Sequence, residues 1–543
     1  MHGGSVNLFD ANLDILRRRF PDIARRVAAA EPAQDILFST SKNGLQIVYE
    51  LFGNREYPLH STVDPSREAQ RLLQAAGDSG FSVVYGLGAA WHLEGLLKCK
   101  NREVLVIIDG PGRLRSFISA RDYRELLEHP RLRILLDPGP EDLAEHLRNS
   151  YLPGLHGGFS FSCLPALSTR RRERYEQLRH AADLALNQIR NDFSVQAHFG
   201  LLWSRNCIAN LAYLKDFTAA SAYAPLLTEL QKNRAILVGA GPSLREDRDL
   251  ILQMAADSLL VGVDTALPFL QQLDLKPDLV VSMDSQYYTL LHALKPGSLD
   301  IPWVLTLSAP PALFRSLGRP FIFAGGIPME LSFARKTGIP RMDTRGGNVL
   351  QAALSLVLSM GMEDITLFGA DYAQPGGIPY APGTYVDQWF RIRETRTTPY
   401  LGQSLGFTFK GRLEQDIREY DPLYPCRRLD RYRENMETYL QRSSSRLKIH
   451  GVAASLLSAV RRTPVPRIES FQLRVPEDSL RPSEFLREIS GEIRNGAPGT
   501  VQLLYPLISY LRNRERSGGT DPDEIIEEAR GLFLDLVSLY AGE

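Results

Sequence analysis

The run Ala235-Ile-Leu-Val-Gly-Ala-Gly-Pro-Ser-Leu244 decides the fold of this 543-residue chain. Its first four residues are apolar, which is typical of a buried strand. A tight turn into a helix is then predicted at Gly239, Gly241, Pro242 and Ser243. Such a turn lets a ligand approach the backbone, and the free N–H groups that open the next helix favour an anion such as a nucleotide phosphate. Glycine turns also serve ordinary strand-to-helix connections, so both interpretations stay open.

Three later strand-like segments each end in an acidic residue. Apolar runs at 259–263, 279–283 and 365–368 are followed by Asp264-Thr265, by Asp284 with Gln286, and by Asp371. Helix-like stretches lie between the strands, which predicts a parallel sheet with helices on both faces. Residues just past the strand ends of such a sheet converge on one crevice. A single Asp is more often a helix cap or turn former, but three of them beside a glycine turn favour a polar cleft.

Composition and charge restrict the class of protein. Lys plus Arg and Asp plus Glu number 63 each, which excludes a strong overall attraction to nucleic acid or to an anionic membrane. The cysteines are far apart and form no Cys-x-x-Cys pair, so we expect reduced thiols and no metal site. We find no signal peptide and no apolar run long enough to cross a bilayer. We therefore expect a cytoplasmic protein that is not inserted in a membrane.

The chain is too long for one hydrophobic core, and we expect three parts. These are an N-terminal Rossmann-like α/β domain over residues 1–165, a helical connector with the central domain over 166–430, and a helical C-terminal domain over 431–543. The N-terminal part has its own glycine turn, Gly86-Leu-Gly88, and an acidic strand end, Asp109. This pattern is common, and we interpret the part as a non-catalytic Rossmann-like domain. The predicted class is α/β, with a central, mainly parallel sheet.

Several motifs follow one another in order along the chain. They are Tyr57-Pro-Leu-His60-Ser61, Gly86-Leu-Gly88, Trp203-Ser-Arg-Asn206 with Asn210, Gly239-Ala-Gly-Pro-Ser-Leu244, Val263-Asp-Thr-Ala-Leu267, Lys276-Pro-Asp278, Ser282-Met-Asp284, Gly346-Gly-Asn-Val349 and Gly369-Ala-Asp371. With them the chain resembles the motility-associated factor glycosyltransferases, a family also described as having a 6-hydroxymethylpterin diphosphokinase MptE-like domain. The C-terminal region contributes almost nothing to this resemblance.

A second block reads Arg345-Gly-Gly-Asn-Val349, Gly361-Met-Glu-Asp-Ile365 and Thr366-Leu-Phe-Gly-Ala-Asp371, and it continues into Tyr380-Ala381. In this block the central domain is similar to bacterial sialyltransferases that use CMP-activated sialic acid. Those relatives carry a Tyr-Ala pair whose tyrosine hydrogen-bonds the leaving-group phosphate. The resemblance implies that role for Tyr380.

The resemblance implies transfer of a nine-carbon acidic sugar, of the pseudaminic or legionaminic kind, from a CMP-activated donor to serine or threonine of flagellin. We expect Tyr380 and Asp371 to be catalytic. The expected substrate- and nucleotide-binding residues are Gly239, Gly241, Pro242, Ser243, Asp264, Thr265, Asp284, Gln286, Gly346, Gly347 and Asn348. CMP is a monophosphate, so we expect no required metal or other cofactor. Backbone N–H groups and tyrosine hydroxyls suit the negative charge that develops on the phosphate.

The general base is not assigned by the sequence. Many relatives have a His shortly after the Gly-x-Asp strand, whereas this chain has none between His292 and His450. His is the usual base near neutral pH, and Asp387 and His450 stay open for this role.

Two other classes of function stay open. One is a pterin diphosphokinase that uses ATP and Mg²⁺, with the ion held by carboxylates such as Asp264, Asp278 or Asp284. The other is a nucleotide-binding protein without catalysis.

Overall fold

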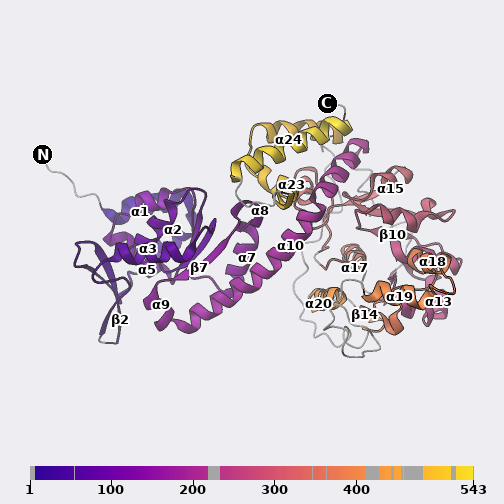
Figure 1. Ribbon diagram of the computed structural model, residues 1–543, viewed down its shortest axis with the longest axis horizontal. Helices are drawn as coiled ribbons and strands as arrows, with labels where there is room; N and C mark the ends of the chain where they lie inside the picture. The colour runs from indigo at the N-terminus through magenta and orange to yellow at the C-terminus, as the bar shows by residue number, and fades with distance from the viewer. Residues whose placement is uncertain are drawn as a thin grey trace. The chain divides into compact units, whose positions relative to one another are not determined.

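The computed structural model describes residues 7–53, 55–217, 233–318, 320–344, 346–362, 364–409, 427–441, 446–453, 457, 481–514 and 521–541. The chain forms two compact units. The first consists of Met1–His198 with Ile508–Glu527, and the second of Phe199–Leu507 with Glu528–Glu543. The boundary lies inside the long helix α10, Arg172–Tyr213 (Figure 1). The residues after 507 are divided between both units, and the domain ends expected at 165 and 430 stay a prediction.

The first unit contains two sheets. An antiparallel sheet has the order β1-β2-β3, and a parallel sheet has the order β6-β5-β4-β7. The strands are β1 Ile36–Thr40, β2 Gln46–Phe52, β3 Arg55–Pro58, β4 Phe81–Tyr85, β5 Glu103–Ile108, β6 Leu132–Leu136 and β7 Phe159–Cys163. The helices are α1 Leu8–Arg19, α2 Pro21–Ala29, α3 Pro65–Ala76, α4 Trp91–Leu97, α5 Pro111–Ala120, α6 Arg124–Glu128, α7 Pro140–Ser150, α8 Pro153–His156 and α9 Pro165–Arg170. The expected α/β character of this part is present.

The second unit is built on a parallel sheet with the order β12-β11-β10-β9-β8-β13-β14. Its strands are β8 Arg234–Val238, β9 Leu259–Val263, β10 Leu279–Ser282, β11 Trp303–Thr306, β12 Phe321–Phe323, β13 Asp364–Phe368 and β14 Arg446–Ile449. The central strands β8, β9 and β10 are almost wholly buried, as strands covered on both faces must be. The predicted α/β class with a central parallel sheet is confirmed.

Helices and short 3₁₀ turns connect these strands. The 3₁₀ turns are η1 Pro242–Arg245, η2 Asp264–Ala266, η3 Tyr287–Ala293, η4 Ser298–Asp300 and η5 Pro375–Gly377. The α-helices are α13 Arg248–Ala255, α14 Leu267–Gln272, α15 Pro311–Ser316, α16 Pro328–Thr337, α17 Val349–Ser359, α18 Tyr385–Ile392, α19 Tyr400–Phe409, α20 Arg427–Gln441, α22 Pro482–Arg494, α23 Thr500–Arg514 and α24 Pro522–Ala541. The C-terminal part expected to be helical also contains β14, which pairs in parallel with β13 and extends the sheet.

The strand order reverses at β8. Strands β9 to β12 follow on one side of it, and β13 and β14 lie on the other. In open α/β sheets, ligands bind outside the carboxyl ends of the strands at such a reversal. The loops that follow β8, β9, β10 and β13 at this edge carry most of the site residues expected from the sequence.

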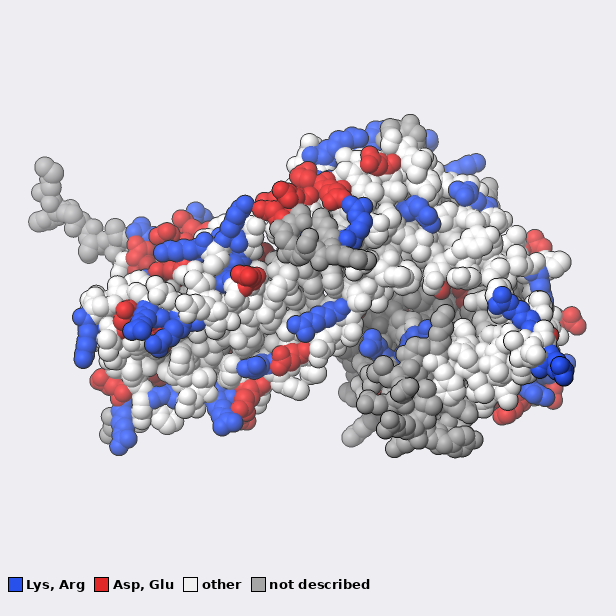
Figure 2. Space-filling view, viewed as in Figure 1, with Lys and Arg blue, Asp and Glu red and all other residues white. Residues whose placement is uncertain are grey.

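The surface carries charges of both signs. Lys and Arg side chains lie among Asp and Glu side chains on the face that Figure 2 shows, in keeping with the equal totals of 63. Within the described ranges, no helix combines the length and the apolar character that crossing a membrane requires.

Candidate functional site

The glycine turn after β8 packs against the loop after β13. Gly239 N–H donates to Phe368 O at 2.8 Å, and Gly241 N–H donates to Gly369 O at 3.3 Å. A Cβ atom on Gly241 would lie 2.4 Å from Asp371 Oδ2 and 2.6 Å from Gly369 O. The close approach that requires glycine here is therefore between two loops of the protein.

Asp371 joins three segments at this edge. It is 3% exposed, its Oδ2 accepts from Ser243 N–H at 2.8 Å, and its Oδ1 accepts from Val452 N–H at 2.8 Å. The N–H of Ser243, which the sequence pattern predicted to bind a phosphate, thus donates to the carboxylate of Asp371 instead. Both carboxylate oxygens of Asp371 have backbone partners, and its catalytic role stays a prediction. Ser243 Oγ is buried without a hydrogen-bond partner, so its hydroxyl is the group that stays available.

Replacing Gly241 with Ala is expected to lower the free energy of unfolding by about 1–3 kcal/mol, the usual cost of overpacking. Its φ of −67° suits alanine, so the loss would come from the contact with Asp371 and Gly369 alone. The matched control is Gly406→Ala in α19, where a Cβ meets nothing within 4 Å. Alanine there should stabilise the helix by about 0.5–1 kcal/mol. Urea unfolding measures both, and an unchanged midpoint for Gly241→Ala would contradict the packing.

Asp264 is an anchored anion at the end of β9. It is 2% exposed, and its carboxylate accepts from Ser282 Oγ at 2.6 Å, from Thr265 N–H at 2.6 Å and from Thr265 Oγ1 at 2.9 Å. The side chain of Thr265 therefore holds Asp264, and both residues stabilise the turn that opens η2. Because three donors already satisfy the carboxylate, its main effect on a ligand is electrostatic.

Asp284 is the more open carboxylate of this edge. Its side chain is exposed, and Oδ1 accepts from Gln286 N–H at 2.9 Å. Partial desolvation of the carboxyl raises the pKa of Asp284, and the negative charge of Asp264 raises it further. The hydrogen bond from Gln286 N–H lowers the pKa and so opposes both effects. Asp284 is thus better placed than Asp264 to accept a hydrogen bond from a ligand.

Tyr380 lies beside the glycine turn. The next residue, Ala381, donates its N–H to Ala240 O at 2.9 Å, which ties the segment after β13 to the turn after β8. Burial raises the pKa of Tyr380, the charge of Arg428 opposes this, and Asp264 and Asp284 add to it. The phenol therefore lies within electrostatic reach of both aspartates, and it stays protonated as a hydrogen-bond donor near neutral pH.

The Gly346-Gly-Asn segment opens α17. Asn348 Oδ1 accepts from Gln351 N–H at 3.0 Å and caps the helix. Gly347 has a φ of 70°, and a Cβ there would lie 3.0 Å from the ring of Tyr432 on α20. These contacts give Gly347 and Asn348 a structural role at the strand-end side of the sheet. Arg345 and Glu363 of the sequence motif lie outside the described residues.

The two bases left open by the sequence are both engaged elsewhere. Asp387 is buried, accepts from Gly383 N–H at 2.8 Å and Tyr400 Oη at 2.8 Å, and pairs with Arg391 at 2.9 Å. His450 follows β14, stacks on Phe368 with ring centroids 4.7 Å apart, and has Nδ1 3.4 Å from Asp247 Oδ1. Both side chains hold loops together.

Asp278 does not join the other acids. It precedes β10, and its Oδ2 accepts from Leu260 N–H at 2.8 Å, so it lies at the amino end of the strands. Asp278 therefore lies at the opposite end of the strands from Asp264 and Asp284, the two other carboxylates considered as Mg²⁺ ligands. Within the described part of the chain, no three His, Cys, Asp or Glu side chains are grouped to hold a metal ion.

Two residues that were not expected from the sequence interact electrostatically with the candidate site residues. Arg428 on α20 acts on Tyr380, and His292 in η3 is acted on by the charges of Asp264 and Asp284. His292 follows the strand-end residue Asp284 by eight positions, and this proximity in sequence was the one feature that pointed to it. Arg428 is distant in sequence and left no such signal.

A cavity of about 290 Å³ opens at the carboxyl ends of β10 and β11. It is lined by Leu202, Arg205, Asn206, Ser285, Tyr287, Pro310, Pro311, Ala312, Arg315 and Tyr540. Asn206 fixes its floor, because its Nδ2 donates to Ser285 O at 3.0 Å and to Ser308 O at 2.9 Å. The Asn206 motif thus shapes the loop that carries Asp284.

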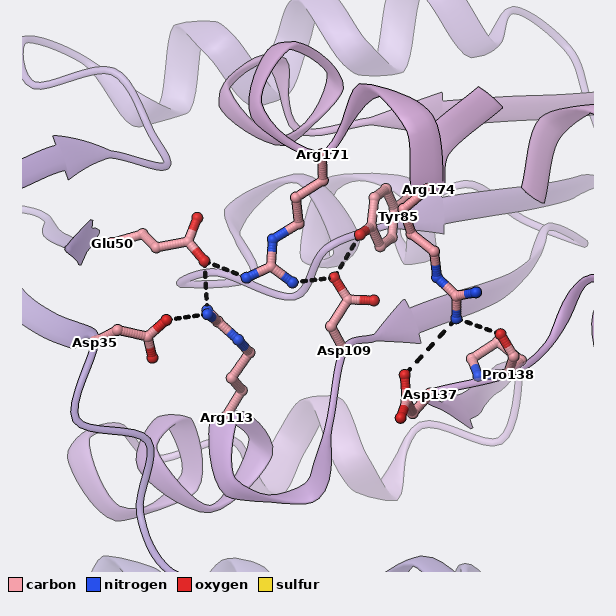
Figure 3. Close-up of polar contacts among 9 residues, drawn as sticks. All are labelled: Asp35, Glu50, Tyr85, Asp109, Arg113, Asp137, Pro138, Arg171 and Arg174. Atoms are coloured by element: carbon pink, nitrogen blue, oxygen red, sulfur yellow. Dashed lines mark hydrogen bonds and ion pairs between the residues drawn. The ribbon is translucent and has the colours of Figure 1, made fainter. Parts of the chain in front are cut away.

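The corresponding edge of the first unit is filled by its own side chains. A Cβ on Gly88 would lie 2.2 Å from His60 Nε2, which accepts from Ala89 N–H at 2.7 Å. The acidic strand end Asp109 accepts from Tyr85 Oη and from Arg171, as Figure 3 shows. In a nucleoside-binding fold of this kind, the glycine turn and the acidic strand end would contact the nucleoside. Here His60 contacts the turn, and Tyr85 and Arg171 contact the acid.

A family model described as "6-hydroxymethylpterin diphosphokinase MptE-like" matches residues 205–377. An uncharacterized protein of Treponema pallidum (strain Nichols) is 33% identical over 145 residues, which are 26% of this chain and 66% of the relative. Another from the same strain is 30% identical over 150 residues, 27% of this chain and 54% of the relative. This chain therefore spans between about half and two thirds of the length of these relatives.

A solved structure of a Maf glycosyltransferase from Magnetospirillum magneticum AMB-1 is also similar. It shares 14% identity with this chain, the match covers 99% of this chain and 96% of the other, and the TM-score is 0.46.

Proposed function

We propose that this chain, whose residues 205–377 form a domain of the MptE-like family, is a glycosyltransferase. It would move a nonulosonic acid of the pseudaminic or legionaminic kind from CMP to serine or threonine of flagellin. The observation that carries the proposal is the position of Tyr380, whose neighbour Ala381 bonds to the glycine turn and whose hydroxyl feels the charges of Asp264 and Asp284. The sequence resemblance to sialyltransferases supports the same role for this tyrosine.

The donor phosphate needs positive charge and hydrogen-bond donors where negative charge develops. The amides of the glycine turn are largely used within the protein, since those of Gly239, Gly241 and Ser243 all have partners. The Tyr380 hydroxyl, the Arg428 guanidinium and the unpartnered Ser243 Oγ are the groups that suit this task. Asp284 suits a hydroxyl or amino group of the donor, because the residue is exposed and its carboxylate accepts from one backbone amide, that of Gln286.

The test is a comparison of CMP and ATP in thermal unfolding of the full chain, with and without Mg²⁺. Binding to the folded state raises the unfolding temperature as the nucleotide concentration passes its Kd. Stabilisation by CMP without added Mg²⁺ supports the glycosyltransferase. Stabilisation by ATP only when Mg²⁺ is present would instead support the diphosphokinase.

A transfer assay separates an enzyme from a binding protein. Purified flagellin is incubated with the CMP-activated sugar and the chain, and its intact mass is measured. A mass increase of one sugar residue per site is expected, together with release of CMP. CMP binding without any mass change would favour the non-catalytic alternative.

A further inference from the structure

His292 is a buried imidazole whose Nδ1 has no hydrogen-bond partner. It lies in η3 with 6% of its surface exposed. The ring meets Tyr385 of α18 edge-on, with centroids 4.7 Å apart and an interplanar angle of 68°. A buried polar group without a partner destabilises the folded state, so its presence here calls for a role beyond packing.

The surroundings of His292 suit a group that starts neutral and becomes charged. Burial lowers its pKa, while the carboxylates of Asp264 and Asp284 oppose this by favouring the imidazolium. Asp264 comes from η2, which packs against η3, and Asp284 lies just before η3. Of the other elements packed against η3, α14 has no charged residue and α15 contributes the exposed Arg315. Helix α18 contributes the phenol of Tyr385, whose pKa is raised by burial, so it stays neutral beside the ring.

We propose that His292 is the general base of the transfer, in place of the histidine that many relatives carry after the Gly-x-Asp strand. This inference rests on the proposed function. The bond between the anomeric carbon and the CMP phosphate oxygen breaks, and its electron pair stays on the phosphate. The acceptor oxygen bonds to the anomeric carbon, and its proton passes to a ring nitrogen of His292. The proton later leaves to solvent.

The neighbouring acids fit supporting roles in this step. Asp264 is held by three donors, and its charge favours the imidazolium once the proton has arrived. Asp284 adds a second negative charge from the solvent side. His292 therefore combines a neutral resting state with a stabilised charged product, which is what a base near neutral pH requires.

The first test is His292→Gln in the flagellin transfer assay. Turnover should fall about 100- to 10,000-fold, the range of general acid–base catalysis, while the Kd for CMP stays within about twofold. The acidic limb of the pH–rate profile should disappear in the variant. The matched control is His180→Gln on the exposed part of α10, which should leave turnover unchanged. Turnover and pH profile of His292→Gln equal to those of the wild type would overturn the assignment.

The second test needs no substrate, so it separates this inference from the proposed function. NMR titration of the labelled His292 ring in the full chain should give a pKa below 6.5, and Asp284→Asn should lower it further. A pKa at or above 6.5, or one insensitive to Asp284→Asn, would overturn the assignment even if the wild type transfers sugar. Failure of the wild type to bind CMP would count against the proposed function instead.

Discussion

Replacing Tyr380 with Phe is expected to lower turnover about 10- to 1,000-fold, as removal of one oxyanion-type donor does. The change removes only the hydroxyl that faces the donor phosphate in the proposed reaction. Its contribution grows as negative charge builds on the leaving group, so binding of CMP should weaken much less than turnover falls. Transfer of the CMP-activated sugar to flagellin, measured at saturating donor, gives the turnover. Calorimetry gives the Kd for CMP.

A control tyrosine separates this effect from general loss of a hydroxyl. Tyr213 is 40% exposed at the end of α10, and its ring packs edge-on against Phe314, a contact that Phe would keep. Tyr213→Phe should have wild-type turnover. If Tyr380→Phe behaves in the same way, Tyr380 only packs its segment and has no part in the chemistry.

Replacing Arg171 with Met is expected to cost about 3–5 kcal/mol of unfolding free energy in the first unit, the usual loss when one partner of a buried ion pair is removed. Arg171 bridges Glu50 and Asp109, whose side chains are 5% and 15% exposed. Figure 3 shows that Arg113 also contacts Glu50, at 2.7 Å, and that Tyr85 donates to Asp109. Methionine has a side chain of similar length but leaves the Asp109 carboxylate without the Arg171 cation. The midpoint of chemical unfolding should therefore shift to a much lower denaturant concentration.

The adjacent residue provides the control. Arg172 is 77% exposed and pairs with the exposed Glu176 at 2.7 Å, where solvent screens the pair, so Arg172→Met should leave the unfolding midpoint nearly unchanged. Equal losses for Arg171→Met and Arg172→Met would show that the buried network contributes no more than a surface pair.

The sequence by itself determined the parallel core of both units. The runs that end at Tyr85, Val238, Val263 and Phe368 are strands, because a strand buried on both faces is apolar without interruption and is followed by a turn. The sequence also marked the loops that follow these strands, since parallel strands bring their carboxyl ends to one edge. It could not give β14, which is short and far from its neighbours along the chain.

Only the tertiary structure decided what the marked residues contact. Asp371 and Ser243 are far apart in sequence, and their hydrogen bond turns an expected phosphate site into an internal contact. In the first unit, His60 likewise packs against the glycine turn at Gly88 and takes the space that a ligand would need there. His292 belongs to no motif; it was identified from its buried, unpartnered Nδ1 and from the charges of Asp264 and Asp284 that act on it. Periodicity and spacing report which face of an element is buried, whereas hydrogen bonds and charges between distant loops depend on how the elements pack.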